Sequence, residues 1–231
     1  WSGASSTSQR ANARQRRRGF DLVRSNPAIC GYNFTGMLDH AITGEGAWDF
    51  FRHWKPGYFD ALADGLAPLR WCLFVTPMHA YSGGVIRVEA ALANDGALAP
   101  GVYPVAFRIL GPAGVAWELN RDMRVPKTLR GNETPLAIEV LNEEVVLEGP
   151  AGSYEFAASM LSGGKPAGGR KEFQLSSQDE LLPIEAEVVL WGVYAQAKAW
   201  LEARGISCRE FEGTEAAMAT RTRGRAQVVL V

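Results

Sequence analysis

Hydrophobic and polar residues alternate along several short runs between residues 71 and 175, which is the pattern of strands that bury one face. In the clearest run, Ile86 and Val88 alternate with Arg87 and Glu89. The alternating runs are 86–92, 103–109, 115–120, 136–140, 154–160 and 173–175. Turn-forming segments such as Asn94-Asp95-Gly96 lie between them. About seven short strands at this interval predict an antiparallel β-sandwich of immunoglobulin type over residues 70–177.

Residues 1–69 follow a helical period instead. The hydroxyls of residues 5–8 can cap a helix that Asn26-Pro27 ends, because the residue before a proline avoids the helical region. A strand-compatible run, residues 28–34 (AICGYNF), then leads into a loop rich in aromatic and ionisable groups, and Pro56 opens a second amphipathic helix. Helix, strand, loop and helix cannot bury both faces of the strand alone, so we predict the last β/α unit of a (β/α)8 barrel (TIM barrel).

After a polar linker, the last part of the chain alternates strands and helices. Residues 187–191 form a continuous apolar strand, and residues 192–205, 206–211, 215–223 and 228–231 read as helix, strand, helix and strand. The linker is residues 178–186, and residues 187–231 predict the truncated start of a flavodoxin-like or Rossmann-like α/β domain. The first turn lacks the GxGxxG spacing of dinucleotide sites, so we expect a packing or homo-oligomerisation module.

Composition and charge are those of an ordinary globular protein, and they exclude few functions. The chain has 24 Lys and Arg against 25 Asp and Glu, a net charge of −1, which gives no reason to expect nucleic acid or a membrane as partner. No apolar run approaches the ~20 residues of a membrane-spanning helix. Three scattered cysteines favour reduced thiols, and a cytoplasmic location is the expectation. Because residue 1 is Trp1 and the chain stops within a strand-like run, we expect an internal piece of a longer protein.

The loop after residue 34 carries the candidate chemistry. Asp39, Glu45 and Asp49 are carboxylates, and a glycosidase needs two, one to protonate the leaving oxygen and one to attack or activate water. The alternative is structural: Asp39 caps the loop, Glu45 lies in a Gly-flanked turn, and Asp49 pairs with Arg52 or His53. We favour a structural or substrate-orienting role, because barrel chemistry draws on several strand ends.

Aromatic residues in the same region have two interpretations. Tyr32, Asn33 and Phe34 lie at the end of the expected strand, and Trp48 lies in the loop, where rings can stack on a sugar face. The rings can equally pack beneath the loop, and we expect Trp54 to pack in the core. No metal-ligand spacing links the histidines to the carboxylates, so neither a metal nor a cofactor is expected.

These residues also carry a family resemblance. The segments are 20–35 (FDLVRSNPAICGYNFT), 44–49 (GEGAWD), 55–62 (KPGYFDAL) and 67–70 (APLR). Together they resemble the end of the catalytic barrel in glycoside hydrolase family two, the β-galactosidase and β-glucuronidase group. In that family the last barrel helix is followed by a sandwich domain, which is the order expected here.

The resemblance implies a retaining glycosidase whose two catalytic glutamates follow the fourth and seventh barrel strands. Both would precede Trp1, so we expect no catalytic residue in this chain and no turnover by it alone. The resemblance also implies that Tyr32, Asn33 and Phe34 lie where an aromatic residue of the family lines the sugar pocket. With Asp39, Glu45 and Trp48 of the loop, they are the residues expected to contact a carbohydrate substrate. Phe34 stands where a Trp is usual in the family.

Two other classes of function remain open from the sequence. The first is a non-enzymatic carbohydrate-binding or adhesion module, in which Tyr103, Trp117 and Tyr154 would form an exposed, coplanar face on the sandwich. The second is a structural or oligomerisation protein built on residues 187–231.

Overall fold

The computed structural model describes residues 2–29, 31–34, 36–40, 44, 46–127, 134–177, 187–190, 195–210 and 227–230. The chain divides into two compact units, Trp1–Asp179 and Glu180–Val231. Each unit has its own secondary structure and its own small or large apolar core.

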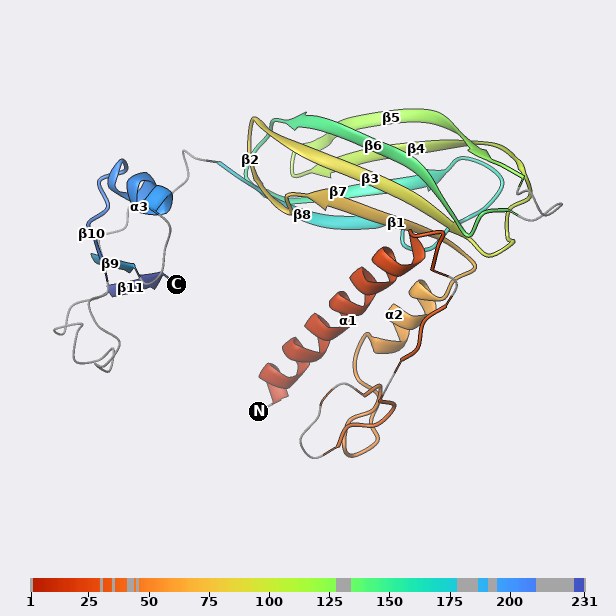
Figure 1. The fold of residues 1–231 in the computed structure, drawn as a ribbon, viewed down its shortest axis with the longest axis horizontal. Coiled ribbons are helices and arrows are strands. Elements are labelled where there is room, and N and C mark those ends of the chain that lie inside the picture. The colour runs from red at the N-terminus through yellow and green to blue at the C-terminus, as the bar shows by residue number, and fades with distance from the viewer. Residues whose placement is uncertain are drawn as a thin grey trace. The chain divides into compact units, whose positions relative to one another are not determined.

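The larger unit contains a sandwich of two β-sheets (Figure 1). One sheet has the strand order β1-β3-β6 and the other β2-β8-β7-β4-β5. The strands are β1 Leu69–Thr76, β2 His79–Tyr81, β3 Gly84–Asn94, β4 Gly101–Gly111, β5 Gly114–Val125, β6 Ala137–Leu147, β7 Gly152–Met160 and β8 Arg170–Ser176. All pairs are antiparallel except β2 with β8. The predicted sandwich is therefore confirmed, and its immunoglobulin type stays a prediction.

The alternating positions of the sequence form the core between the two sheets. Ile86 and Val88 of β3 are fully buried, while Arg87 between them is exposed. Phe107 of β4 is fully buried, with its ring centroid 5.6 Å from that of Trp71 and 6.1 Å from that of Phe156. Burial of such rings supplies most of the stabilisation of a sandwich, since each removes a large apolar area from water.

Two helices precede the sandwich, α1 (Ser2–Arg24) and α2 (Tyr58–Gly65), and they lie side by side (Figure 1). Their contact is close because Gly65 has no side chain. A Cβ atom there would come within 2.1 Å of the Phe20 ring, so a glycine is required at this crossing. Both predicted helices are confirmed, and α1 ends before Asn26-Pro27 as expected.

Within the strand predicted over residues 28–34, the described residues 31–34 do not form a strand in this chain. Residues 31–34 have no strand partner and their side chains are exposed. An extended segment becomes a strand only when a neighbouring strand pairs with its N–H and C=O groups, and no described segment pairs with this one. The sandwich is thus the established part of the fold class, and the barrel stays a prediction.

The smaller unit contains a three-stranded parallel sheet with the order β10-β9-β11. Its elements are β9 Glu187–Leu190, α3 Ala195–Glu202, β10 Cys208–Glu210 and β11 Gln227–Leu230. Val188, Leu190 and Leu201 form its small apolar core. The predicted strand–helix–strand order is present, the helix predicted over 215–223 lies outside the described residues, and the flavodoxin-like assignment stays a prediction.

Candidate functional site

The loop between α1 and α2 is held by backbone pairing around Trp48. Isolated bridges join Leu38 to Trp48 and Trp48 to Trp54. The Asp39 N–H donates to the Trp48 carbonyl at 3.0 Å, and the Lys55 N–H donates to the Ala47 carbonyl at 3.2 Å. The loop therefore has a defined shape before any side-chain contact is considered.

A buried ion pair organises the interior of this loop. Lys55 Nζ lies 2.7 Å from Asp39 Oδ1 and also donates to the Gly44 carbonyl at 2.5 Å. The same carboxylate oxygen accepts the Gly46 N–H at 2.8 Å. A Cβ atom on Gly46 would come within 2.6 Å of the Asp39 nitrogen, so the approach requires glycine. Asp39 thus holds the loop together, which is the structural alternative considered for it.

A tight turn at Asp49 presents aromatic rings to solvent. Asp49 Oδ1 accepts the His53 N–H at 2.8 Å, and Oδ2 lies 3.2 Å from the imidazole Nδ1. The His53 N–H bond is the main reason that the pKa of the Asp49 carboxyl lies below its usual value. Arg52 adopts φ 66°, an uncommon left-handed conformation for a residue other than glycine. Phe50 and Phe51 lie exposed at the tip of this turn.

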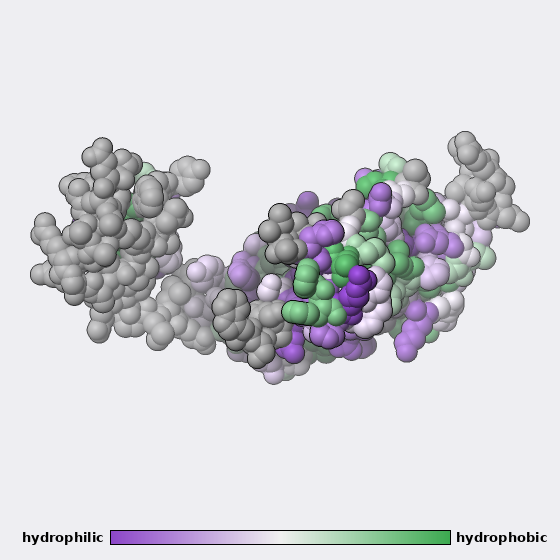
Figure 2. All heavy atoms as spheres, turned by 90° about the horizontal axis from the view of Figure 1, so that it is seen from below, coloured by the Kyte–Doolittle hydropathy of each residue, from purple (hydrophilic) through white to green (hydrophobic). Residues whose placement is uncertain are grey.

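Trp48 and Trp54 stack within the loop and continue onto α2. Their ring centroids lie 4.4 Å apart, and Trp54 meets the Phe59 ring edge-on at 3.8 Å. Trp54 is nonetheless 55% exposed, so the expectation that it packs in a core is wrong for this chain. In the view of Figure 2, apolar side chains in green lie beside charged ones in purple on this part of the surface.

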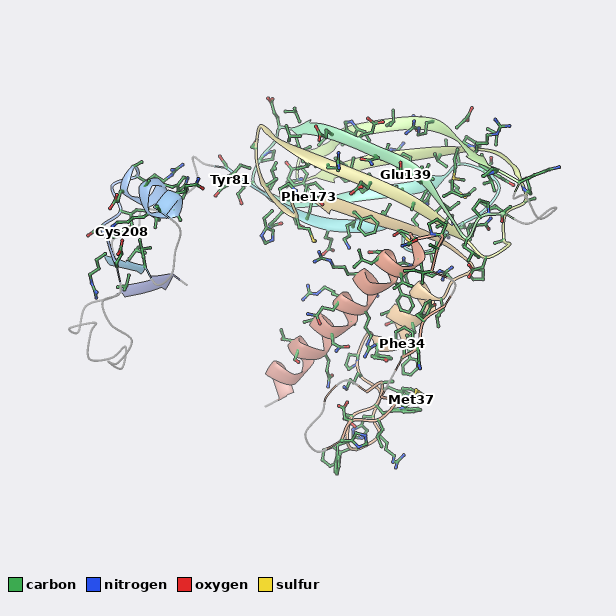
Figure 3. The ribbon with its side chains drawn as sticks, viewed as in Figure 1. Phe34, Met37, Tyr81, Glu139, Phe173 and Cys208 are labelled. Carbon is green, nitrogen blue, oxygen red and sulfur yellow. The ribbon has the colours of Figure 1, made fainter. Side chains whose placement is uncertain are left out.

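Tyr32 and Phe34 lie against the end of α1. The Phe20 ring contacts the Tyr32 ring at 5.6 Å and the Phe34 ring at 5.4 Å between centroids. The guanidinium of Arg16 lies 4.5 Å from the Tyr58 ring centroid, which adds a cation–π contact across the two helices. Figure 3 shows Phe34 near the helices and Met37 further along the loop. Asn33, between the two rings, is exposed.

The structure therefore brings the expected substrate-binding residues together in two groups. Tyr32 and Phe34 share contacts with Phe20, while Asp39 and Trp48 share the loop interior. Glu45 lies outside the described residues. Among the described residues no cluster of three or more His, Cys, Asp or Glu side chains could hold a metal ion.

Sequence reasoning missed the role of Lys55. A single lysine between Trp54 and Pro56 carries no local signal, and its carboxylate partner, Asp39, lies 16 positions away. The burial of the lysine stem and ammonium, with 6% of the side chain exposed, became visible only in three dimensions.

The rings that could have formed a binding face on the sandwich pack inward. Tyr154 is buried in the sandwich core and its hydroxyl donates to the Pro150 carbonyl at 2.9 Å. Tyr103 and Trp117 are half-buried against the same core. These three residues therefore do not form an exposed coplanar platform.

Comparison with known proteins gave no family. The chain matches no family model, and no curated protein matches it.

None of the described helices is long and apolar enough to cross a membrane.

Solved structures that resemble the chain include two glycosidases and a DNA glycosylase. A glycosyl hydrolase family 2 member from Bacteroides cellulosilyticus is 18% identical with a TM-score of 0.33, over 46% of this chain and 15% of that one. The β-glucosidase from Listeria innocua is 10% identical with a TM-score of 0.31, over 46% and 16%. The Pseudomonas fluorescens alkylpurine DNA glycosylase AlkC is 14% identical with a TM-score of 0.31, over 52% and 34%.

The chain thus spans about a third of the DNA glycosylase and about a sixth of each glycosidase. At these identities and TM-scores the likeness assigns neither a family nor a function to the chain. Mostly antiparallel β-structure in a sandwich is the established description of its fold.

Proposed function

We propose that this chain belongs to a retaining glycoside hydrolase of the β-galactosidase and β-glucuronidase type. In this proposal residues 1–69 complete a catalytic (β/α)8 barrel, residues 70–177 form the sandwich that follows it, and residues 187–231 begin a flavodoxin-like domain. The two catalytic glutamates come from polypeptide that precedes Trp1. The substrate is a carbohydrate with an O-glycosidic bond.

The observation that carries this proposal is the exposed aromatic surface between α1 and β1. Six large rings in this part of the chain are at least 40% exposed: Tyr32, Phe34, Phe50, Phe51, Trp54 and Phe59. Exposed rings that gather in one part of a chain are typical of an interface or a ligand site. The missing strands and helices of a barrel are one body of polypeptide that could cover it.

The arrangement of residues 2–66 supports a barrel as that body. Two adjacent helices, α1 and α2, flank residues 31–34 in sequence, and these residues have no strand partner among the described residues. Neighbouring barrel strands would supply the missing backbone partners. The loop that follows residue 34 would then lie at the carboxyl end of the strand, where barrel enzymes place their active sites.

The loop has the chemistry of a sugar-binding wall in this proposal. Trp48 and Trp54 offer stacked rings, which combine an apolar face with an N–H that can donate to a hydroxyl. Asp39 is already bound by Lys55 and the Gly46 N–H, so its role is to fix the loop rather than to transfer a proton. Acid–base work and nucleophilic attack fall to the two glutamates of the preceding polypeptide, through a covalent glycosyl intermediate.

Hydrolysis of nitrophenyl glycosides tests the proposal directly. The 231-residue chain and the longer protein that its reading frame encodes are assayed side by side against α- and β-linked galactosides, glucosides and glucuronides. We expect turnover by the longer protein alone. Turnover by the 231-residue chain would refute the location of the glutamates, and no turnover by the longer protein on any glycoside would refute the glycosidase.

A further inference from the structure

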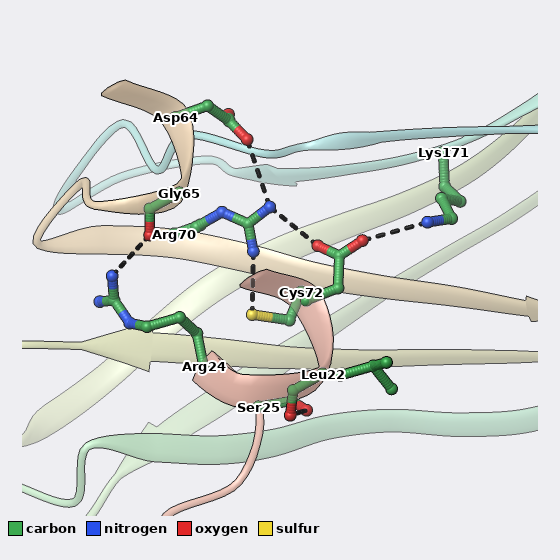
Figure 4. A network of polar contacts seen from close by, with 9 residues as sticks. Leu22, Arg24, Ser25, Asp64, Gly65, Arg70, Cys72 and Lys171 are labelled. Carbon is green, nitrogen blue, oxygen red and sulfur yellow. Dashed lines mark hydrogen bonds and ion pairs between the residues drawn. The ribbon is translucent and has the colours of Figure 1, made fainter. Parts of the chain in front are cut away.

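A buried arginine stands where the helices meet the sandwich. Arg70, at the start of β1, is 1% exposed. Its Nη2 lies 2.8 Å from Asp21 Oδ1 on α1 and 3.2 Å from Asp64 Oδ2 on α2, and its Nη1 donates to Cys72 Sγ at 3.3 Å (Figure 4). One guanidinium from the sandwich thus binds a carboxylate from each helix.

Two further cations complete this contact. Lys171 of β8 donates to the second oxygen of Asp21 at 3.1 Å, so Asp21 joins both sheets of the sandwich to α1. Arg24, in the last turn of α1, donates to the carbonyls of Gly65 at 2.8 Å and Ala67 at 3.2 Å. It also pairs with Asp95, between β3 and β4, at 2.9 Å. We call Asp21, Arg24, Asp64, Arg70 and Lys171 the Arg70 joint.

Unlike these ion pairs, the main apolar contacts lie within the sandwich or within the helix pair. The large core of the sandwich is built from residue 69 onward, and it includes no described residue of α1 or α2. The helices bury Phe20 against Gly65 instead, in a contact of their own. Ion pairs and hydrogen bonds of the joint therefore connect the helix pair to the sandwich, beside a second, small apolar cluster of Cys72, Ala91 and Ala93 on β1 and β3.

The sandwich holds its half of the joint in place. The connection between β7 and β8 passes over Arg70, where the Trp71 N–H donates to the Ala167 carbonyl at 2.8 Å. Gly168 follows with φ +69°, and a Cβ there would lie 2.5 Å from the Trp71 carbonyl oxygen and 3.2 Å from Arg70 Cγ. The backbone of residues 167 and 168 covers Arg70 on the side of the sandwich. The ion pairs of the guanidinium therefore form with Asp21 and Asp64 on the helices.

The three cations of the joint face its two carboxylates, Asp21 and Asp64, and Asp95 beside Arg24 supplies a third carboxylate. Burial acts to lower the pKa of Arg70, but the groups around the guanidinium, Asp21 first among them and Asp64 also, together outweigh this effect and the pKa is raised. Burial raises the pKa of Cys72 to about 11, so this thiol stays neutral and supplies no charge. Asp21 is thus the nearer of two counter-charges of a buried cation, and its loss would leave that cation with Asp64 alone.

We infer that the Arg70 joint is an electrostatic dock. It fixes α1 and α2 to the sandwich as one unit, and that unit opens as a whole while the sandwich remains folded. Proteins open in such cooperative units where few apolar contacts cross a boundary. The inference does not depend on the proposed enzymatic function, since every residue of the joint lies within this chain.

Native-state hydrogen exchange of the 231-residue chain tests the dock. In the unaltered protein, amides of residues 10–24 should share one opening free energy that is lower than that of β4. Asp21→Asn should speed their exchange about a hundredfold, because buried Arg70 loses the nearer of its two carboxylate partners and Lys171 loses its own, while β4 stays protected. Asp60→Asn, which changes an exposed carboxylate on α2, is the matched control and should leave both unchanged.

A double variant separates charge from packing. In Asp21→Leu with Arg70→Met no uncompensated guanidinium remains, so exchange of residues 10–24 should be at least about tenfold slower than in Asp21→Asn. No slowing would overturn the electrostatic origin of the dock. Equal exchange free energies for α1 and β4 in the unaltered protein, loss of protection in β4 with Asp21→Asn, or no effect of Asp21→Asn would each overturn the dock itself.

Discussion

The sandwich and the 65 or so residues before it use the same kinds of side chain in opposite ways. In the sandwich, Phe107 and Phe156 are fully buried between two sheets. Before it, Phe51 is 76% exposed and Trp54 is 55% exposed, although the sequence there is at least as aromatic. The sandwich closes on its own core, whereas the residues before it leave several large aromatic rings exposed.

The difference teaches that aromatic content alone does not make a core. Each sandwich strand offers apolar side chains on one face, and the opposite sheet supplies a complementary face at the same register. The described residues of the loop between α1 and α2 meet no such opposing face, and a largely buried ion pair and backbone turns link them instead.

Replacing a phenylalanine in each region should give the largest contrast. Phe107→Ala leaves a cavity beside Trp71 and Phe156, and should lower the free energy of unfolding by about 3–5 kcal/mol. Phe51→Ala, on the exposed tip, should change it by no more than about 0.5 kcal/mol. Urea unfolding followed by circular dichroism measures both. Equal losses would mean that the tip is also part of a core.

Substitutions at two glycines of the loop should have smaller effects that are confined to the loop. Gly46→Ala forces a Cβ against Asp39 and Leu38, and should speed exchange of the Lys55 amide about tenfold or more. Gly44→Ala, with nothing within 4 Å of the added atom, is the matched control. Hydrogen exchange should show the sandwich unaffected by either change. Faster hydrogen exchange of β4 amides in Gly46→Ala would mean that the loop and the sandwich open together, which would contradict the comparison.

Lowering the pH through the pKa of Asp49 is expected to have the smallest effect on stability. The folded pKa of Asp49 lies below its ordinary value of 3.8, chiefly because the carboxylate accepts the His53 N–H. The turn therefore gains its stabilisation above the unfolded pKa, and loses it as the pH falls through the lower folded value. An NMR titration of the carboxyl carbon should show a midpoint below 3.8. A midpoint at or above that value would contradict the bonded turn.

Much of the secondary structure could be predicted because it depends on local periodicity. Ile86 and Val88 alternate with Arg87, and burial follows that alternation in β3. Both helices before the sandwich were also predictable from their helical period and flanking prolines, although α1 begins at Ser2, so residues 5–8 lie within it rather than capping it. For the candidate site the sequence could indicate Asp39 and Trp48 as residues of one loop. It could not indicate that Lys55 neutralises Asp39, because nothing local links the two.

The amino-acid sequence by itself determined where the two helices before the sandwich and the sandwich strands form, since side-chain periodicity and turn residues act over a few positions. Only the tertiary structure decided that residues 31–34 stay without a strand partner, and that Asp21 meets Lys171 across 150 positions. The physical reason is that pairing of backbone groups and of buried charges depends on which distant segments arrive at the same place. Periodicity carries no information about that arrival.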